Sequence, residues 1–215
     1  GCLCAVIPCL RRPAPAPAPV FTPAPKRKRC CCLRLCRRRP PKPNRNPKIK
    51  IKPPTPGQSE VLGISVAYLV KTFRKEVTAV FGDEDPNYYE VNKKMLYSDI
   101  AKGRFIKCPR DGREGCSYVD AVNLLEPGHT QPATLMLSWS WHYTVETVVW
   151  ALERWCRLNG KDPKKVFVWQ CALCNNQFRV EESKAKGEWE SFDTFKDMFE
   201  KRMDHTSHIL SLMAP

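Results

Sequence analysis

Two short stretches of this chain carry polar and aromatic side chains of the kind that binds ligands. The first combines two tryptophans with two serines and a histidine, and the second is rich in amides. Indole rings stack on planar rings, while hydroxyl and amide groups donate and accept hydrogen bonds. No catalytic residue is assigned from these types alone. The candidate ligand-binding residues are Ser138, Trp139, Ser140, Trp141, His142, Gln170, Asn175, Asn176 and Gln177.

Each polar stretch follows an apolar run, as at the end of a buried strand. Residues 133–137 read Ala-Thr-Leu-Met-Leu, and residues 166–169 read Val-Phe-Val-Trp. Between them, apolar residues recur at helical spacing over 144–158, and Asn159-Gly160 is typical of a helix end. A strand–helix–strand unit has parallel strands, and ligands gather beyond the carboxyl ends of such strands. The sequence therefore predicts that the two polar stretches meet at one edge of a parallel sheet.

The flanking segments complete the predicted architecture. A helix over 191–203 and a third strand over 208–213 follow the strand–helix–strand unit. Before it, apolar spacing predicts one helix from Glu60 to Val80, closed by Gly82, and a second over 87–101. The buried side of the second helix is expected to carry Tyr88, Val91, Met95, Leu96 and Ile100.

A β-hairpin is expected between these helices and the first strand. Residues 104–107 and 117–122 alternate like short strands, and the Asp111-Gly112 pair between them marks a turn. The expected fold is thus α/β, with a short parallel sheet of about three strands. Its domains are a tail over 1–57, a helical and hairpin extension over 58–131, and the core over 132–215. The hairpin or a partner is expected to cover the exposed sheet edge.

Charge and proline separate the tail from the body. Residues 1–57 hold 15 of the 36 Lys and Arg, 14 of the 20 prolines, and no Asp or Glu. Residues 58–215, the body of the chain, contain the remaining 21 basic residues and all 22 acidic ones, so the net charge of the body is close to zero. Such a tail buries too little apolar surface to offset its chain entropy, which predicts disorder. The Lys/Arg runs leave nucleic acid or an anionic membrane surface open as its partner.

The first residues of the tail resemble a lipidation signal. Gly1 followed by Cys2 and Cys4 is similar to the start of proteins that are myristoylated on glycine and palmitoylated on cysteine. The small hydroxyl residue usual after such a glycine is absent, because Ala5 and Val6 stand there. One acyl chain with a polybasic patch would give stable membrane binding. A low-complexity nuclear-import or RNA-binding tail is the alternative.

Other chemistry is weakly supported by the sequence. Cys108 and Cys116 flank the expected turn, but a zinc site needs two more ligands, so buried thiols are the expectation. Cys171 and Cys174 form a C-x-x-C motif without a basic neighbour that would lower a thiol pKa. Glu146 is expected to be a solvated helix charge. No apolar run is long enough to span a membrane, and the cysteine pattern favours a reduced, intracellular protein.

Two elements in these stretches resemble a known family. Leu137-Ser-Trp-Ser-Trp141 and Val168-Trp-Gln-Cys-Ala-Leu-Cys-Asn-Asn-Gln177 are similar to the two signature strands of HET (heterokaryon-incompatibility) domains, which are relatives of TIR domains. The stretch 104–177 also resembles a group of dinoflagellate proteins that share a C-P-R-D-G-x-x-G-C-x-Y-V-D element. The signature strands cover some 45 residues, and the second is the more specific.

The resemblance implies a fold and two functions. The fold is a flavodoxin-like or TIR-like three-layer α/β sandwich around a parallel sheet. TIR relatives either assemble in signalling or cleave NAD with a glutamate carried on a later helix. Here Gln170 replaces the family's aspartate, and an amide cannot act as a base. The chain is also expected to stop before the glutamate-bearing helix.

These expectations order the functional hypotheses. The first is a non-catalytic HET/TIR-like interaction or assembly module in intracellular signalling, with protein partners or self-association. It needs no cofactor and is expected in the cytoplasm, with peripheral membrane attachment or a nuclear location as alternatives. The second is an NAD(P)-binding or NAD-cleaving glycohydrolase, with NAD as cofactor and the candidate residues lining its site. The third is nucleic-acid binding through the basic tail.

Overall fold

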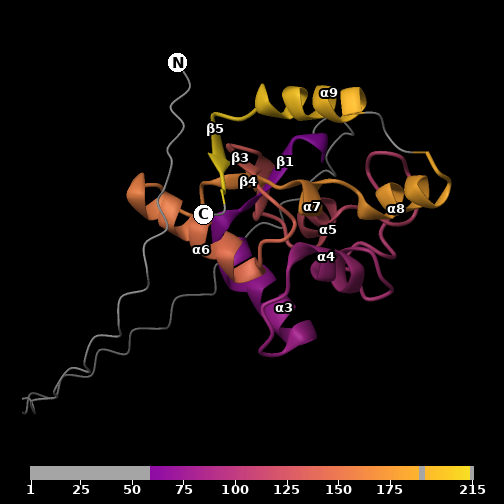
Figure 1. Ribbon diagram of the computed structural model, residues 1–215, viewed down its shortest axis with the longest axis horizontal. Coiled ribbons are helices and arrows are strands. Elements are labelled where there is room, and N and C mark those ends of the chain that lie inside the picture. Colours follow the sequence, from indigo (N-terminus) through magenta and orange to yellow (C-terminus); the bar gives the residue numbers. More distant parts are fainter. Residues whose placement is uncertain (1–58, 189–191, 214–215) are drawn as a thin grey trace, which may run out of the picture. The chain divides into compact units, whose positions relative to one another are not determined.

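A computed structural model describes residues 59–188 and 192–213, drawn in colour in Figure 1. The expectations for the tail, including lipidation at Gly1, Cys2 and Cys4, therefore lie outside the described residues. Within the described part of the chain, no helix has the length and apolar character needed to cross a membrane.

A mixed five-stranded sheet of order β2-β1-β4-β3-β5 forms the centre of the fold. Strand β3 (Leu135–Ser138) is parallel to both β4 (Phe167–Trp169) and β5 (His208–Ser211), so the three predicted parallel strands are confirmed. Strand β1 (Leu62–Ser65) pairs antiparallel with β4, and β2 (Thr130–Pro132) pairs antiparallel with β1. The expectation of about three parallel strands is therefore right, but the sheet is larger than expected, since residues 62–65 and 130–132 add two antiparallel strands.

In the extension over 58–131, residues 62–65 form strand β1 where apolar spacing predicted a helix. All four residues of β1 are buried, because the strand fills the space beside β4. Gly63 permits this approach: a Cβ there would lie 2.9 Å from the Val168 carbonyl carbon. The helix starts after the Ser65 cap, whose side chain accepts from the Tyr68 amide, and not after Ser59. It runs through α2 (Val66–Tyr68), the π-helical turn η1 (Leu69–Phe73) and α3 (Arg74–Phe81).

The predicted helix ends are right in one case and wrong in the other. Gly82 ends α3 as expected, with a φ of 67° that suits glycine. The second helix comprises α4 (Tyr88–Val91), begun by an Asn87 capping box, and the π-helical turn η2 (Asn92–Leu96). It stops before Ala101, because Tyr97 leaves the helical conformation. Ile100 consequently lies outside the helix and is 68% exposed, which contradicts its predicted burial.

The expected hairpin is also wrong. Its first half is a loop with a single bridge between Lys107 and Glu114, and its second half is helix α5 (Tyr118–Leu125). Alternation of apolar residues was misleading because nearly every residue of 117–122 is buried, on all sides of the helix. Ser117 starts α5 by accepting from the Asp120 amide. The edge of β4 is covered by β1 and not by a hairpin.

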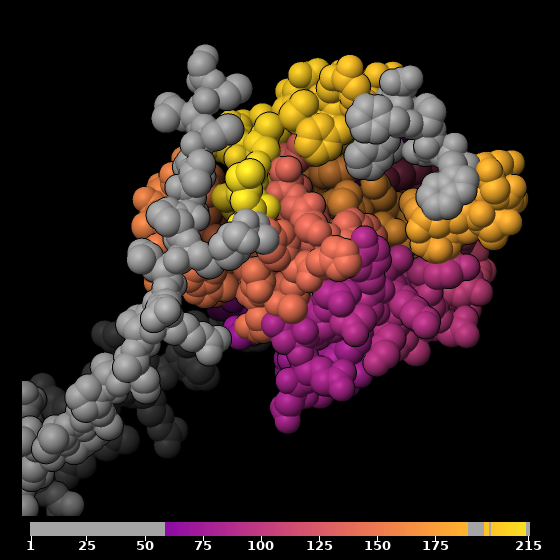
Figure 2. All heavy atoms as spheres, viewed as in Figure 1, coloured from indigo at the N-terminus to yellow at the C-terminus, as the bar shows by residue number. Residues whose placement is uncertain are grey.

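Helices pack on both sides of the sheet. Helix α6 (Val145–Leu158) and helix α9 (Phe192–Met203) lie on opposite sides of the strands in Figure 1. Between β4 and α9 come the short α7 (Cys171–Cys174) and α8 (Gln177–Ala185). The strand β5 lies at one edge of the sheet, and part of it is visible at the surface in Figure 2. The predicted core residues of α6 are all buried: Val145, Val148, Val149, Leu152 and Trp155.

Candidate strand-end binding site

A cavity of about 310 Å³ lies where the parallel strands β3 and β4 end. Four of the nine candidate residues line it, namely Ser138, Trp139, Trp141 and Asn175. The sequence analysis missed the other four lining residues, which are Leu137, Trp169, Cys171 and Phe199. Phe199 comes from α9, far along the chain, and no local pattern indicates that it reaches this position. A larger depression on the outer face of η1 and α3, lined by Lys71 and Arg74, is shallow and open.

Aromatic rings form much of the cavity wall. The rings of Trp139 and Trp141 lie nearly parallel, with an interplanar angle of 15° and centroids 6.1 Å apart. Behind them, Tyr88 meets Trp139 edge-on at 4.4 Å. Tyr88 is fully buried at the start of α4, so the capping box that begins α4 also supports the tryptophan pair. Helix α4 therefore supports the cavity wall through the packing of Tyr88 on Trp139.

Two indole N–H groups beside this cavity form no hydrogen bond of normal geometry among the described residues. Trp169 is only 4% exposed, and its Nε1 has no hydrogen-bond partner among the described residues. The Nε1 of Trp139 is likewise buried without a hydrogen bond of normal geometry in the described part of the chain, although the Cys171 sulfur is close enough for the indole N–H to act on its pKa. Most buried donors in proteins are paired, so these two are exceptions, and both nitrogen atoms are buried out of reach of a molecule in the cavity.

The cysteines of the C-x-x-C motif are poor nucleophiles here. Burial raises the pKa of Cys171, which lines the cavity, although the nearby indole N–H groups of Trp141 and Trp139 oppose this shift. Burial also raises the pKa of Cys174 to about 12, although the main-chain N–H of Gln170 donates to its sulfur at 3.4 Å and opposes this shift. Both thiols are therefore protonated at neutral pH, and the geometry gives no support to a redox role.

Gln170 does not line the cavity. Its side chain is 1% exposed, and neither amide atom has a hydrogen bond of normal geometry among the described residues. Burial raises the pKa of Tyr88, and the neighbouring Gln170 amide partly offsets that effect. Successive residues of a strand point to opposite faces, so Trp169 faces the cavity while Gln170 faces the α4 side.

Asn176 and Gln177 are used inside the fold. The Asn176 amide donates to the Gly115 carbonyl at 2.9 Å, and its oxygen accepts from the Phe178 N–H at 3.1 Å. The Gln177 amide donates to the carbonyl of Ala172 at 3.0 Å. Both side chains are more than nine-tenths buried. They join the loop after α7 to its neighbours and are not placed to meet a ligand.

A polar network around Arg110 was not anticipated from the sequence. Arg110 Nε lies 3.1 Å from the carboxylate of Asp120, which is completely buried. A terminal nitrogen of Arg110 donates to the Cys174 carbonyl at 2.9 Å. The hydroxyls of Ser59 and Ser117 both donate to Asp120. This Arg110–Asp120 network ties the loop before α5 to the end of α7, the helix whose first residue, Cys171, lines the cavity.

The turn that contains Asp111 is fixed by a second set of contacts. The guanidinium of Arg179 donates to Asp111 at 2.6 Å, and the Arg113 amide donates at 3.0 Å. These donors, Arg179 first, hold the pKa of Asp111 well below its usual range. Gly115 has a φ of 87°, and a Cβ there would lie 3.1 Å from the Phe178 ring. The C-P-R-D-G element thus has a structural role: its turn packs on α8 and forms an ion pair with Arg179 of that helix.

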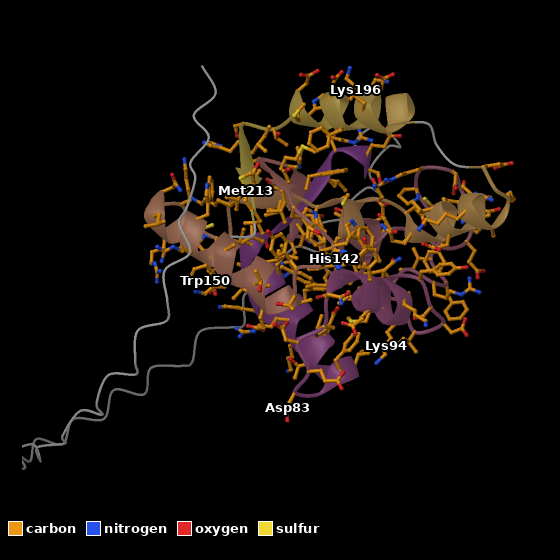
Figure 3. The ribbon with its side chains drawn as sticks, in the orientation of Figure 1. Asp83, Lys94, His142, Trp150, Lys196 and Met213 are labelled. Carbon is orange, nitrogen blue, oxygen red and sulfur yellow. The ribbon has the colours of Figure 1, made fainter. Side chains whose placement is uncertain are left out.

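The last two candidates lie at the surface. Ser140 and His142 are exposed, and the His142 amide donates to the Ser140 hydroxyl at 3.3 Å. The His142 ring packs against Tyr89 of α4 with centroids 5.1 Å apart. Figure 3 shows His142 well apart from Trp150, which projects from α6. His142 is therefore adjacent to Trp141 in the chain but is not a lining residue.

The remaining candidate chemistry has a simple structural account. Cys108 and Cys116 are buried free thiols, and burial raises the pKa of Cys116 to about 12. Within residues 59–188 and 192–213, no group of three or more His, Cys, Asp or Glu could hold a metal ion. Glu146 forms an exposed ion pair with Arg74, which joins α6 to α3.

Fold and site together define an α/β protein with an aromatic cavity at the ends of two parallel strands. Comparison of the chain with protein-family models, with curated proteins and with solved structures finds no match.

Proposed function

We propose that this chain is a HET/TIR-like interaction module that acts by binding in intracellular signalling and not by catalysis. One observation carries the proposal: the residues that line the strand-end cavity are all uncharged. General acid–base catalysis needs a positioned group whose pKa suits proton transfer. The only titratable group lining the cavity is Cys171, whose pKa is raised by burial.

The fate of the family-like polar residues supports the same function. In an enzyme of the HET/TIR type, the polar side chains of the second signature strand would be expected to point at a ligand. Here Asn176 and Gln177 bind main-chain carbonyls, and Gln170 is buried on the other face of β4. The structural use of these residues supports a HET/TIR-like scaffold over a HET/TIR-like reaction in our proposal.

Exposed aromatic groups offer a surface for association. After η2, Tyr97 and Phe105 are 43% and 75% exposed. The Arg104 guanidinium lies 5.6 Å from the Phe105 ring and 5.7 Å from that of Phe178. Aromatic and arginine side chains are the types that dominate binding energy at protein interfaces. We assign this surface, Tyr97, Arg104 and Phe105, to contact with a second copy of the chain.

Sedimentation equilibrium of the full chain tests the association. We expect a concentration-dependent dimer that Phe105→Ala weakens by at least about tenfold, as for an interface residue worth more than about 1.4 kcal/mol. Trp150→Ala is the matched control, because Trp150 is also exposed but lies on α6. A chain that stays monomeric at every concentration would contradict assembly through this surface.

NAD binding or cleavage is the second candidate, favoured by the aromatic wall of the cavity. The test is release of nicotinamide from NAD by the purified chain. Turnover that is lost in His142→Ala would overturn the non-catalytic proposal, because His142 is the imidazole nearest in sequence to the cavity wall. We expect no turnover above the uncatalysed rate, with or without the substitution.

A further inference from the structure

We infer that the body of the chain binds an anionic membrane surface through the outer face of η1, α3 and α6. This outer face combines cations that have no carboxylate partner among the described residues with two exposed apolar side chains, and it is made of residues of the body and not of the tail. It shares no residue with the surface formed by Tyr97, Arg104 and Phe105. The inference therefore goes beyond self-association and does not depend on it.

The first half of the outer face lies on the helix that runs through η1 and α3. Lys71, Arg74 and Lys75 stand at spacings of three and four residues, so they share one side of this helix. All three are exposed, and together with Thr78 they line the shallow depression on that side. Arg74 pairs with Glu146 of α6, whereas Lys71 and Lys75 have no ion pair in the described part of the chain. Two exposed lysines one turn apart are thus left for an anionic partner.

The second half of the outer face lies on α6, beside this helix. The Arg74–Glu146 ion pair joins the two helices, and Trp150, Arg154 and Leu158 follow Glu146 at four-residue intervals along the same side of α6. Trp150 is 49% exposed and Leu158 60%, and Figure 3 shows Trp150 projecting from α6. The Arg154 guanidinium lies 5.4 Å from the Trp150 ring. Cations and exposed apolar groups are therefore mixed on one surface.

The charge of the outer face differs from that of the body as a whole. Residues 58–215 are close to neutral, yet four cations of this face have no ion pair within residues 59–188 and 192–213, namely Lys71, Lys75, Arg154 and Arg157. Of the two acids of α6, Glu146 is paired with Arg74, which leaves Glu153. Each Lys or Arg held near an anionic bilayer strengthens binding about fivefold. The local excess of positive charge thus fits acidic lipid headgroups.

The side chains of the outer face favour a lipid surface over other anionic partners. Tryptophan is enriched where a membrane meets water, and exposed aliphatic groups such as Leu158 bury apolar area at the boundary with the acyl chains. Stacking of a nucleobase needs an open aromatic face, but the Arg154 guanidinium lies over Trp150. Lysine is depleted at protein interfaces, whereas clusters of Lys and Arg are typical of surfaces that bind acidic lipids.

Co-sedimentation of the full chain with vesicles tests the contribution of charge. We expect binding to vesicles of phosphatidylcholine with phosphatidylserine, and weaker binding at high salt because the screening length shortens. Lys71→Ala combined with Lys75→Ala should lower the partition coefficient about fivefold for each lysine. The matched control combines Lys196→Ala with Lys201→Ala. It removes the same charge from α9, on the opposite side of the sheet from α6 (Figure 1), and should bind more tightly than the first variant.

Fluorescence of Trp150 separates binding by the outer face from binding by the basic tail, which is present in all these proteins. The contribution of Trp150 is the difference between the parent and Trp150→Phe. We expect vesicles with brominated acyl chains to quench it, since interfacial side chains lie about 5–10 Å into the headgroup region. Trp150 is exposed and on a helix surface, so the substitution should leave the fold intact.

Four results would overturn the inference. The first is no binding to anionic vesicles, and the second is equal binding by the Lys71/Lys75 variant and the α9 control. The third is unquenched Trp150 fluorescence while the chain pellets with the vesicles, which would show that the tail alone holds the membrane. The fourth is tighter binding of a single-stranded oligonucleotide that the Lys71/Lys75 variant loses. Sedimentation equilibrium contains no lipid, so self-association and membrane binding fail separately.

Discussion

The Arg110–Asp120 network and the strand-end cavity lie on either side of α7 and treat their polar groups in opposite ways. In the network, the buried carboxylate of Asp120 receives a guanidinium and two hydroxyls. Beside the cavity, two buried indole N–H groups form no hydrogen bond of normal geometry with the described residues. Buried polar groups that are paired hold a fold together, whereas an unpaired one costs stability unless water or another molecule supplies its partner.

The stretch from Gln170 to Gln177 contains both kinds of residue. Gln177 resembles Gln170 in type and burial, yet its side-chain amide is hydrogen-bonded, whereas that of Gln170 has no hydrogen bond of normal geometry among the described residues. Resemblance to a family signature therefore does not distinguish residues that support the scaffold from residues that meet a ligand. Only the partners of each side chain make that distinction.

The largest expected effect comes from breaking the Arg110–Asp120 network. Asp120→Ala leaves the Arg110 guanidinium without its buried partner, and loss of one member of a buried ion pair costs about 3–5 kcal/mol. Urea unfolding of the full chain, followed by circular dichroism, measures the change. Lys196→Ala, at an exposed ion pair on α9, should change stability by less than about 0.5 kcal/mol. A loss below about 1 kcal/mol for Asp120→Ala would show that the network contributes little.

The same substitution at two glutamines should have opposite effects. Gln177→Met leaves the Ala172 carbonyl without its donor and is expected to destabilise by about 1–3 kcal/mol. Gln170→Met replaces an unpaired buried amide by an apolar chain of similar shape, and it should be neutral or stabilising by about 1 kcal/mol. Thermal unfolding of both variants checks the pair. If Gln170→Met proved the more damaging, the contact between the Gln170 amide and the neighbouring Tyr88 would be a stabilising one.

The smallest expected effect concerns pH. Arg179 lowers the pKa of Asp111 in the folded chain, so Asp111 stabilises the fold above its unfolded pKa of about 3.9. That contribution disappears as pH falls below about 4 toward the folded pKa. Since the Asp111 carboxylate is 33% exposed, solvent screening limits it to about 1 kcal/mol. Asp111→Asn should therefore flatten stability between about pH 5 and 2, whereas Asp83→Asn, at the exposed end of α3, should not (Figure 3).

Sequence patterns predicted the regular parts of the fold and failed where burial was complete. Helix α6 was predicted because one face is buried and the other is exposed, which gives a clear 3.6-residue period. Strand β1 and helix α5 were misread because both are buried on nearly all sides, so their patterns lack that contrast. At the cavity, Trp139 and Trp141 were predicted from their position after β3. Phe199 was not, since α9 lies on a separate layer.

The sequence by itself determined the three parallel strands, the helix between the first two, and the strand ends where polar and aromatic residues collect. Alternation, helical periodicity and cap residues are local properties, and they act before distant segments meet. The tertiary structure decided that Asn176 and Gln177 support the fold, that Gln170 turns away from the cavity, and that Trp169 faces it. The hydrogen-bond partners of Asn176 come from loop residues up to 68 positions away along the chain. Their roles are therefore set by the packing of those segments and not by residue type.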